Sequence, residues 1–241
     1  MDHEGSMTIK EALGGNAYPG RGILLGKTGG KALAAYFIMG RSENSRNRVF
    51  CMQEGILKTA PFDESRVKDP SLIIYNAVRT FKNRLIVTNG DQTDTVFEAL
   101  QEGKSFQDAL NTRTYEPDAP NYTPRISGLV TFEGEDFTYQ LSILKSSTSS
   151  VVGVIREYYS CVPEEGLGHL IHTYETDGDP LPSFKGAPKR VVLQGSLAEI
   201  AEELWENLDP DNRISLYVRL TDPKTGEFED IIRNKNQKCE R

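Results

Sequence analysis

Residues 22–39 read GILLGKTGGKALAAYFIM and indicate how the fold begins. Residues 23–26 form an apolar run, Thr28, Gly29 and Gly30 favour a turn, and residues 32–39 form a second apolar run. Two strand-like runs that flank a glycine-containing turn predict a β-hairpin. We therefore expect a sheet that starts early in the chain.

Strand-like runs continue on both sides of a helical stretch. Residues 93–102 predict a helix, because Val96, Phe97 and Leu100 share one face and Gly103 follows as a typical C-terminal cap. A capping box, Ser196 to Glu199, predicts another helix near the end of the chain. Further strands are expected at residues 49–57, 72–80, 84–88, 126–132, 137–144, 151–159, 169–174, 190–193 and 214–220, and a short helix at residues 105–110. This order favours an α+β fold with mainly antiparallel sheets.

The two ends of the chain differ from this pattern. Residues 1–14 show little core-forming periodicity, so we expect an N-terminal extension. The remainder, residues 15–241, is expected to form a single domain, because neither a repeat nor a low-complexity linker divides it. The charged tail after Arg233 is expected to fray.

Charge limits the class of ligand. The net charge is −7 and the pI about 5.2, whereas proteins that hold long nucleic acids usually carry a basic stripe. Arginines nevertheless gather at Arg41, Arg46 and Arg48. A local cluster on an acidic chain suits a small anionic ligand better than a nucleic acid polymer.

Composition also predicts the compartment. The longest apolar runs fall well short of the roughly 20 residues that a membrane span needs, and the first residues are polar. Cys51, Cys161 and Cys239 are far apart and odd in number, which disfavours a disulfide framework. A cytoplasmic protein without a membrane partner is expected.

Two common kinds of catalytic centre find no support. His169 and His172 would lie on opposite faces of a strand, and no Cys or His pair stands at zinc spacing, so no metal site is expected. The chain also lacks a G-x-S-x-G motif or a Cys–His pairing that would indicate a nucleophilic triad.

Five polar loops at the ends of predicted strands carry the remaining chemistry. They cover residues 18–22, 41–48, 74–79, 89–94 and 115–125. Arginine binds phosphate through paired donors, and asparagine amides can recognise both edges of a carboxamide. Each loop also has an ordinary structural interpretation, since Asn89-Gly90 is a common turn and Asp91 or Thr93 can cap a helix.

Taken in order, these loops resemble the archaeal-type IMP cyclohydrolases and their bacterial relatives. The matching segments are Tyr18-Pro-Gly-Arg21, Arg41-Ser42 with Asn47-Arg48, Tyr75-Asn76-x-Val78-Arg79, Asn89-Gly-x-x-Thr93-Asp94 and Tyr115-Glu116 with Thr123-Pro124-Arg125-Ile126. A weaker match continues through residues 172–175. The chain departs from the family pattern in a longer Arg41 loop and in its N-terminal extension.

The resemblance implies a four-layer αββα sandwich of mainly antiparallel sheets flanked by helices, like that of the N-terminal-nucleophile hydrolases. It also implies the dehydrative ring closure of 5-formamidoimidazole-4-carboxamide ribotide to IMP, a step of purine biosynthesis, without a cofactor. The ligand would be a small purine ribotide, and the protein would be a homo-oligomer.

The resemblance and the residue types together suggest roles. Arg21 would stabilise charge on the formyl oxygen, and Glu116 and Tyr75 would transfer protons. Tyr75 would need a nearby cation to ionise. Substrate binding is expected from Arg41, Arg48 and Arg125 at the phosphate, from Asn89, Asp91 and Asn121 at the base and ribose, and from Asn47 and Asn76.

Three alternatives remain open. The chain could be a purine-nucleotide-binding protein that has lost its chemistry, an amide hydrolase of the N-terminal-nucleophile type, or a structural module with solvated loops. Fold alone would not separate them.

Overall fold

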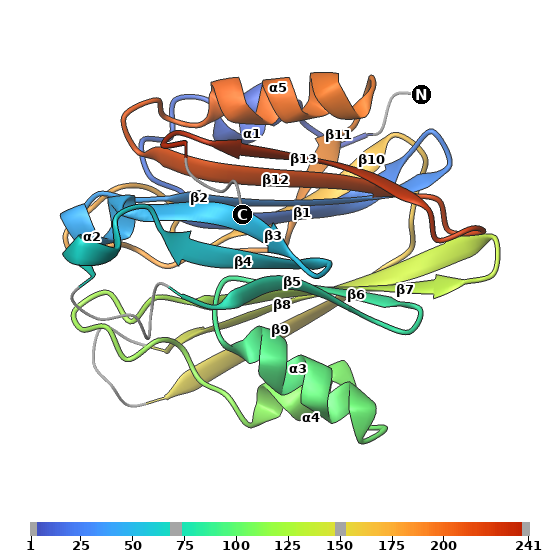
Figure 1. Cartoon of the computed structure of the whole chain (residues 1–241), viewed down its shortest axis with the longest axis horizontal. Coiled ribbons are helices and arrows are strands. Elements are labelled where there is room, and N and C mark those ends of the chain that lie inside the picture. Colours follow the sequence, from blue (N-terminus) through green and yellow to red (C-terminus); the bar gives the residue numbers. More distant parts are fainter. Residues whose placement is uncertain (1–3, 68–73, 148–152, 238–241) are drawn as a thin grey trace.

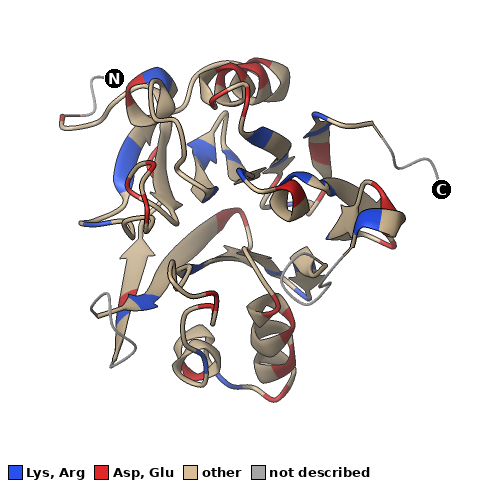
Figure 2. Ribbon diagram, turned by 90° about the vertical axis from the view of Figure 1, so that its left-hand side faces the viewer, with Lys and Arg blue, Asp and Glu red and all other residues tan. Residues whose placement is uncertain are grey.

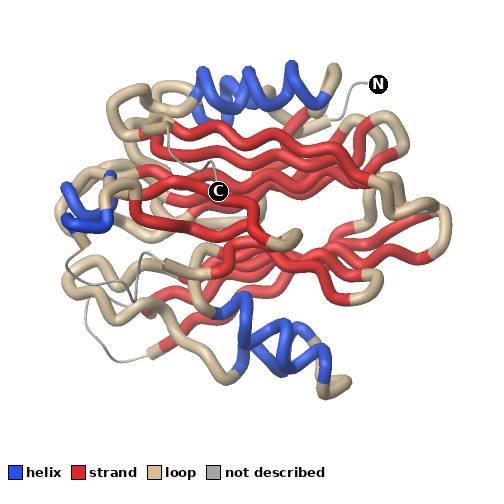
Figure 3. The backbone as a smooth tube through the Cα atoms, viewed as in Figure 1, coloured by secondary structure: helices blue, strands red, loops and turns tan. Residues whose placement is uncertain are grey.

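The computed structural model describes residues 4–67, 74–147 and 153–237. Two β-sheets face each other, and helices cover their outer faces (Figures 1 and 3). Helices α1 (Ile9–Leu13) and α5 (Leu197–Asn207) cover the first sheet, and α3 (Gln92–Gln101) and α4 (Phe106–Asn111) cover the second. The predicted α+β class and αββα layering are confirmed.

The first sheet has six strands, all paired antiparallel. Their order is β11 (Lys189–Val192), β10 (Leu167–His172), β1 (Arg21–Thr28), β2 (Lys31–Met39), β12 (Arg213–Thr221) and β13 (Phe228–Asn234). The hairpin expected from residues 22–39 is β1–β2, and its turn needs Gly29 and Gly30 because φ is +58° and +73° there. The sequence did not predict β13, because this edge strand is partly exposed and carries charged residues among its apolar ones.

The second sheet is a seven-stranded meander in chain order. It consists of β3 (Arg48–Gln53), β4 (Ile56–Pro61), β5 (Asn76–Phe81), β6 (Arg84–Thr88), β7 (Arg125–Glu133), β8 (Asp136–Ser146) and β9 (Val154–Cys161). The single strand expected at residues 49–57 is wrong, since Glu54 and Gly55 have positive φ and turn the chain into a β3–β4 hairpin. The runs expected at residues 72–80 and 151–159 begin outside the described residues.

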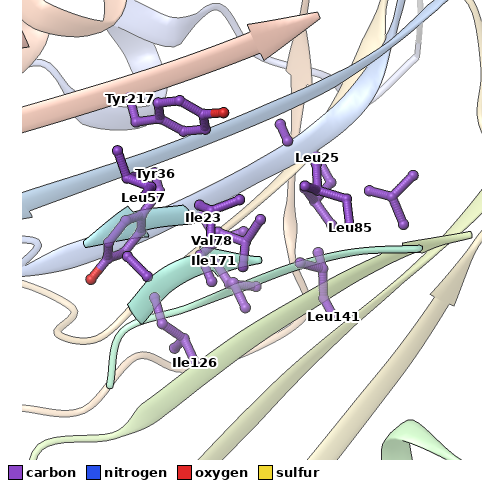
Figure 4. Packing of buried hydrophobic residues seen from close by; sticks show 14 of the residues in the cluster. Ile23, Leu25, Tyr36, Leu57, Val78, Leu85, Ile126, Leu141, Ile171 and Tyr217 are labelled. Carbon is purple, nitrogen blue, oxygen red and sulfur yellow. The ribbon is translucent and has the colours of Figure 1, made fainter. Parts of the chain in front are cut away.

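Apolar side chains fill the space between the two sheets. Ile23 and Leu25 of β1 face inward and meet Val78, Ile126 and Leu141 of the second sheet (Figure 4). The intervening Leu24 faces outward and packs beneath α1 and α5. This alternation is the expected consequence of the two-residue period of a strand. A third apolar layer joins α3 and α4 to the second sheet.

The N-terminal segment contributes to the core, contrary to the expectation for residues 1–14. Helix α1 starts with a capping box between Thr8 and Glu11, and its Ile9, Ala12 and Leu13 are buried in the layer that contains α5. A five-residue helix is too short to show a helical period in the sequence. A helix of this length depends on tertiary packing in addition to its capping box.

The structure also shows the state of two cysteines and the lengths of the helices, from which the sequence analysis expected neither a disulfide framework nor a membrane span. Cys51 is disulfide-bonded, which corrects the expectation drawn from cysteine spacing, and Cys161 is a free thiol. Among the residues described, no helix is long and apolar enough to cross a membrane.

Candidate active site

A cleft of about 240 Å³ lies where several of the polar loops meet. It is lined by five of the residues singled out in the sequence, namely Arg21, Arg41, Arg48, Glu116 and Asn121. The other lining residues were not predicted to bind or react; they are Tyr18, Ser42, Asn44, Ser45, Asp118, Tyr174 and Leu181. Most of them lie in the same loop as a predicted residue, so the loop was found although the role of the individual side chain was not.

Acidic residues are frequent on the outer helices, for example Glu199, Glu202, Glu203 and Glu206 of α5 (Figure 2). The cleft instead contains three arginines beside Glu116 and Asp118. The net negative charge of the chain therefore does not describe the charge that a ligand would meet in the cleft.

The backbone at the entrance of β1 fixes Arg21. Its N–H donates to Thr173 Oγ1 (3.1 Å), and its carbonyl accepts from Thr173 N (2.9 Å). Gly20 has φ +81°, and a Cβ there would stand 2.2 Å from Thr173 Oγ1, so only glycine permits this approach. The Arg21 side chain lines the cleft, and its buried Nε has no hydrogen-bond partner in the structure.

Arg48 is fully buried at the start of β3. Its Nε donates to Ser45 O (2.8 Å) and its Nη2 to Met39 O (3.1 Å), which holds the guanidinium in place. Burial and the positive charge of Arg21 lower the pKa of Arg48. Its buried Nη1 has no hydrogen-bond partner in the structure, and such a donor is costly unless something accepts from it. An anionic group bound in the cleft would supply that acceptor.

Glu116 is the buried carboxylate of the cleft. The proline-rich loop folds back on itself because Glu116 N donates to Thr123 O (2.9 Å), while Asp118 accepts from Thr123 N (2.6 Å). Burial raises the pKa of Glu116 to about 7, although the charges of Arg21 and Arg125 oppose the shift. A carboxylate with this pKa can accept or donate a proton near neutral pH.

Tyr75 is buried directly before β5 and is not one of the residues that line the cleft; its hydroxyl lies 2.7 Å from that of Tyr36. Burial raises the pKa of Tyr75, and it outweighs the nearby charges of Arg48 and Arg21, which lower that pKa. Tyr75 therefore keeps its proton at neutral pH.

Arg125 and Asn89 belong to a network beside the cleft. Arg125 Nη1 donates to Asp91 Oδ1 (2.6 Å) and Gln92 Oε1 (2.7 Å). Asn89 donates from Nδ2 to Pro124 O (2.9 Å) and accepts at Oδ1 from Ile126 N (2.8 Å). Both functional ends of the Asn89 amide are thus occupied by the protein. The network holds the start of β7 and, with it, Arg125.

Three further predicted residues do not line the cleft. Asn47 exchanges two hydrogen bonds with the backbone of Asp63, both 2.8 Å long. Asn76 donates to Asp94 (2.9 Å), and Asp91 is shared by Arg125 and Arg113. In the structure these side chains hold neighbouring segments of the chain together.

The rim of the cleft is aromatic and charged. Tyr18 and Tyr174 stack with ring centroids 5.8 Å apart, and the Arg41 guanidinium lies 5.0 Å from the Tyr18 ring. Arg41 also forms an ion pair with Asp177. Tyr174 belongs to the weaker motif at residues 172–175, which was the sequence signal for it.

The arrangement offers acid–base groups and anion-binding groups from the protein itself. Within the described ranges, no group of three or more His, Cys, Asp and Glu could hold a metal ion. His169 and His172 have separate partners, since His169 Nδ1 lies 2.7 Å from the Tyr139 hydroxyl and His172 Nδ1 lies 2.7 Å from Tyr174 O.

Comparison with known proteins gives one consistent family. A family model described as IMP cyclohydrolase-like protein matches residues 18–226. A protein of Haloquadratum walsbyi named IMP cyclohydrolase is 27% identical over 219 residues, which cover 89% of this chain and 96% of the relative. A protein of the same name from Methanopyrus kandleri is 31% identical over 183 residues, which cover 70% of this chain and 89% of the relative. Another from Methanocella arvoryzae is 34% identical over 119 residues, which cover 47% of this chain and 57% of the relative.

Proposed function

This chain belongs to the IMP cyclohydrolase-like protein family, and we propose that it closes the second ring of the purine base. The substrate is 5-formamidoimidazole-4-carboxamide ribotide, and the products are IMP and water. The single observation that carries this proposal is Glu116, a buried carboxylate with a pKa of about 7 in a cleft that also contains Arg21 and Arg48.

The first step forms the bond between the carboxamide nitrogen and the formyl carbon of the same molecule. An amide nitrogen is a weak nucleophile, so the cleft must hold the formyl group against the carboxamide, which can supply several kcal/mol. Glu116 accepts a proton from the nitrogen, and Tyr75 donates one to the formyl oxygen. Arg21 stabilises the negative charge that develops on this oxygen.

The second step expels water from the resulting carbinolamine. Protonated Glu116 returns its proton to the leaving hydroxyl, while the former formamide nitrogen loses its proton to the Tyr75 phenolate and forms the C=N bond. Both residues regain their starting states, so the cycle needs neither an oxidant nor a cofactor. Burial raises the pKa of both groups, so Tyr75 holds its proton as the acid, whereas Glu116, with a pKa of about 7, can lose its proton and act as the base.

The contacts of the remaining arginines indicate which of them bind the phosphate. We assign the 5′-phosphate to Arg48, whose Nη1 is unpartnered, and to Arg41 at the rim. Arg125 does not line the cleft and binds Asp91 and Gln92, so its role is to lower the pKa of Glu116. Asn121 is assigned to the ribose or base. Cytoplasmic location and homo-oligomer formation stay predictions from the sequence.

The direct test is to incubate purified protein with the formamido ribotide and follow IMP formation by absorbance. Turnover above the spontaneous rate is expected. Tight IMP binding without turnover would support a nucleotide-binding protein instead. Mass spectrometry of the mature N-terminus tests the hydrolase alternative, which requires processing to a new Ser, Thr or Cys.

A further inference from the structure

Tyr36 places a hydroxyl group in the apolar core beside the cleft. It lies in β2, is fully buried, and extends from the first sheet into the space between the sheets (Figure 4). Its ring stacks on Phe50 with centroids 5.4 Å apart, a contact that phenylalanine would make equally well. The hydroxyl lies 2.7 Å from the Tyr75 hydroxyl.

Either hydroxyl can donate while both are protonated, but once Tyr75 has given up its proton only Tyr36 can donate. The positive charges of Arg48 and Arg21 favour a negative charge on Tyr75, because they lower its pKa. Each phenol has one proton. When Tyr75 accepts from Tyr36, its own proton must point elsewhere.

We propose that Tyr36 is a positioning residue for ring closure. By donating to Tyr75 Oη, it orients the Tyr75 proton for transfer to the formyl oxygen. The same hydrogen bond stabilises the phenolate that Tyr75 becomes once its proton has moved. This inference rests on the proposed function, in which Tyr75 is the acid.

The matched control is Tyr217. It lies directly opposite Tyr36 in the β2–β12 pairing and is equally buried, but its hydroxyl donates to Asp230 (3.2 Å). Tyr217→Phe therefore removes a core hydroxyl on the neighbouring strand without touching Tyr75. A general loss of core stability would affect both variants alike.

The experiment measures kcat and KM for the wild-type protein, Tyr36→Phe, Tyr75→Phe, Tyr217→Phe and the double variant of residues 36 and 75. We expect Tyr36→Phe to lower kcat about tenfold, the value of one hydrogen bond to an ionising group, with little change in KM. Tyr217→Phe should retain wild-type kcat. In the Tyr75→Phe background, the change at Tyr36 should cause no further loss, because the two hydroxyls act together.

The outcomes separate this inference from the proposed function. Absence of turnover in the wild-type protein would refute the proposed function. With active wild-type protein, a normal kcat for Tyr36→Phe or additive losses in the double variant would overturn the role of Tyr36. IMP affinity serves as the folding check, and a Tyr36→Phe protein that fails to fold would also overturn it in favour of a structural role.

Discussion

The Glu116 carboxylate and the Arg21 guanidinium line the same cleft, and each shifts the pKa of the other. Arg21 opposes the effect of burial on Glu116, whose pKa is nevertheless raised to about 7. Burial by itself would lower the pKa of Arg21, but the charge of Glu116 contributes to raising it well above its usual value. The pair thus combines a permanent cation with a carboxylate that can exchange protons at neutral pH.

The pH dependence of kcat/KM should follow Glu116. As a base it must be ionised, so kcat/KM should fall as the pH drops through about 7. Arg125→Met removes a cation that lowers this pKa and should move the limb to higher pH. A pH–rate series on both proteins checks this, and a limb near pH 4.5 would contradict the raised pKa of Glu116.

Glu116→Gln should be inactive yet more stable than the wild-type protein above neutral pH. Because the folded-state pKa lies above the ordinary 4.5, ionised Glu116 destabilises the native state by roughly 3 kcal/mol at pH 8, and this cost disappears below pH 4.5. Thermal unfolding of both proteins at pH 8 and pH 4.5 measures the difference. Equal melting temperatures at pH 8 would contradict the conclusion that ionised Glu116 destabilises the native state.

Arg21→Ala should reduce turnover more than binding. Loss of the group that stabilises the developing oxyanion is expected to lower kcat roughly 100-fold or more, with a smaller change in KM. The control is Arg233→Ala, which removes an ion pair with Glu202 outside the cleft. If kcat is intact in Arg21→Ala, the choice of Arg21 is wrong.

Arg48→Met should weaken recognition of the phosphate. IMP affinity is expected to fall roughly 10–100-fold, the value of a charge-assisted hydrogen bond in a buried site. Inosine, which lacks the phosphate, should bind both proteins alike. Calorimetric titration with both ligands measures this, and an equal loss for inosine would assign Arg48 a structural role.

Asn89→Ala should destabilise the fold by roughly 2–4 kcal/mol, because it leaves buried backbone groups of Pro124 and Ile126 without their partner. The matched control is Asn83→Ala. The Asn83 side chain donates to Phe132 O in an exposed turn, so its loss should lower the free energy of unfolding much less. Urea unfolding compares the two. If Asn89→Ala has normal stability but no longer binds IMP, Asn89 contacts the ligand and its role is not structural.

The sequence predicted the elements whose signals are local. The β1–β2 hairpin follows from two apolar runs and adjacent glycines, and the start of α5 follows from the Ser196–Glu199 capping box. The elements that were missed show weaker signals. Helix α1 begins with a capping box but is only five residues long, and β13 is a partly exposed edge strand.

By itself, the sequence determined which loops carry the polar chemistry, because motif spacing and residue type are properties of the chain. Only the tertiary structure decided what each side chain does within them. Asn89 and Arg48 look alike as candidate ligand residues, yet the fold satisfies the amide of Asn89 and leaves Arg48 Nη1 unpartnered. Burial also sets the pKa of Glu116, and the packing of the two sheets brings the Tyr36 hydroxyl next to that of Tyr75. Burial and hydrogen-bond partners depend on residues distant in sequence, which no local pattern can specify.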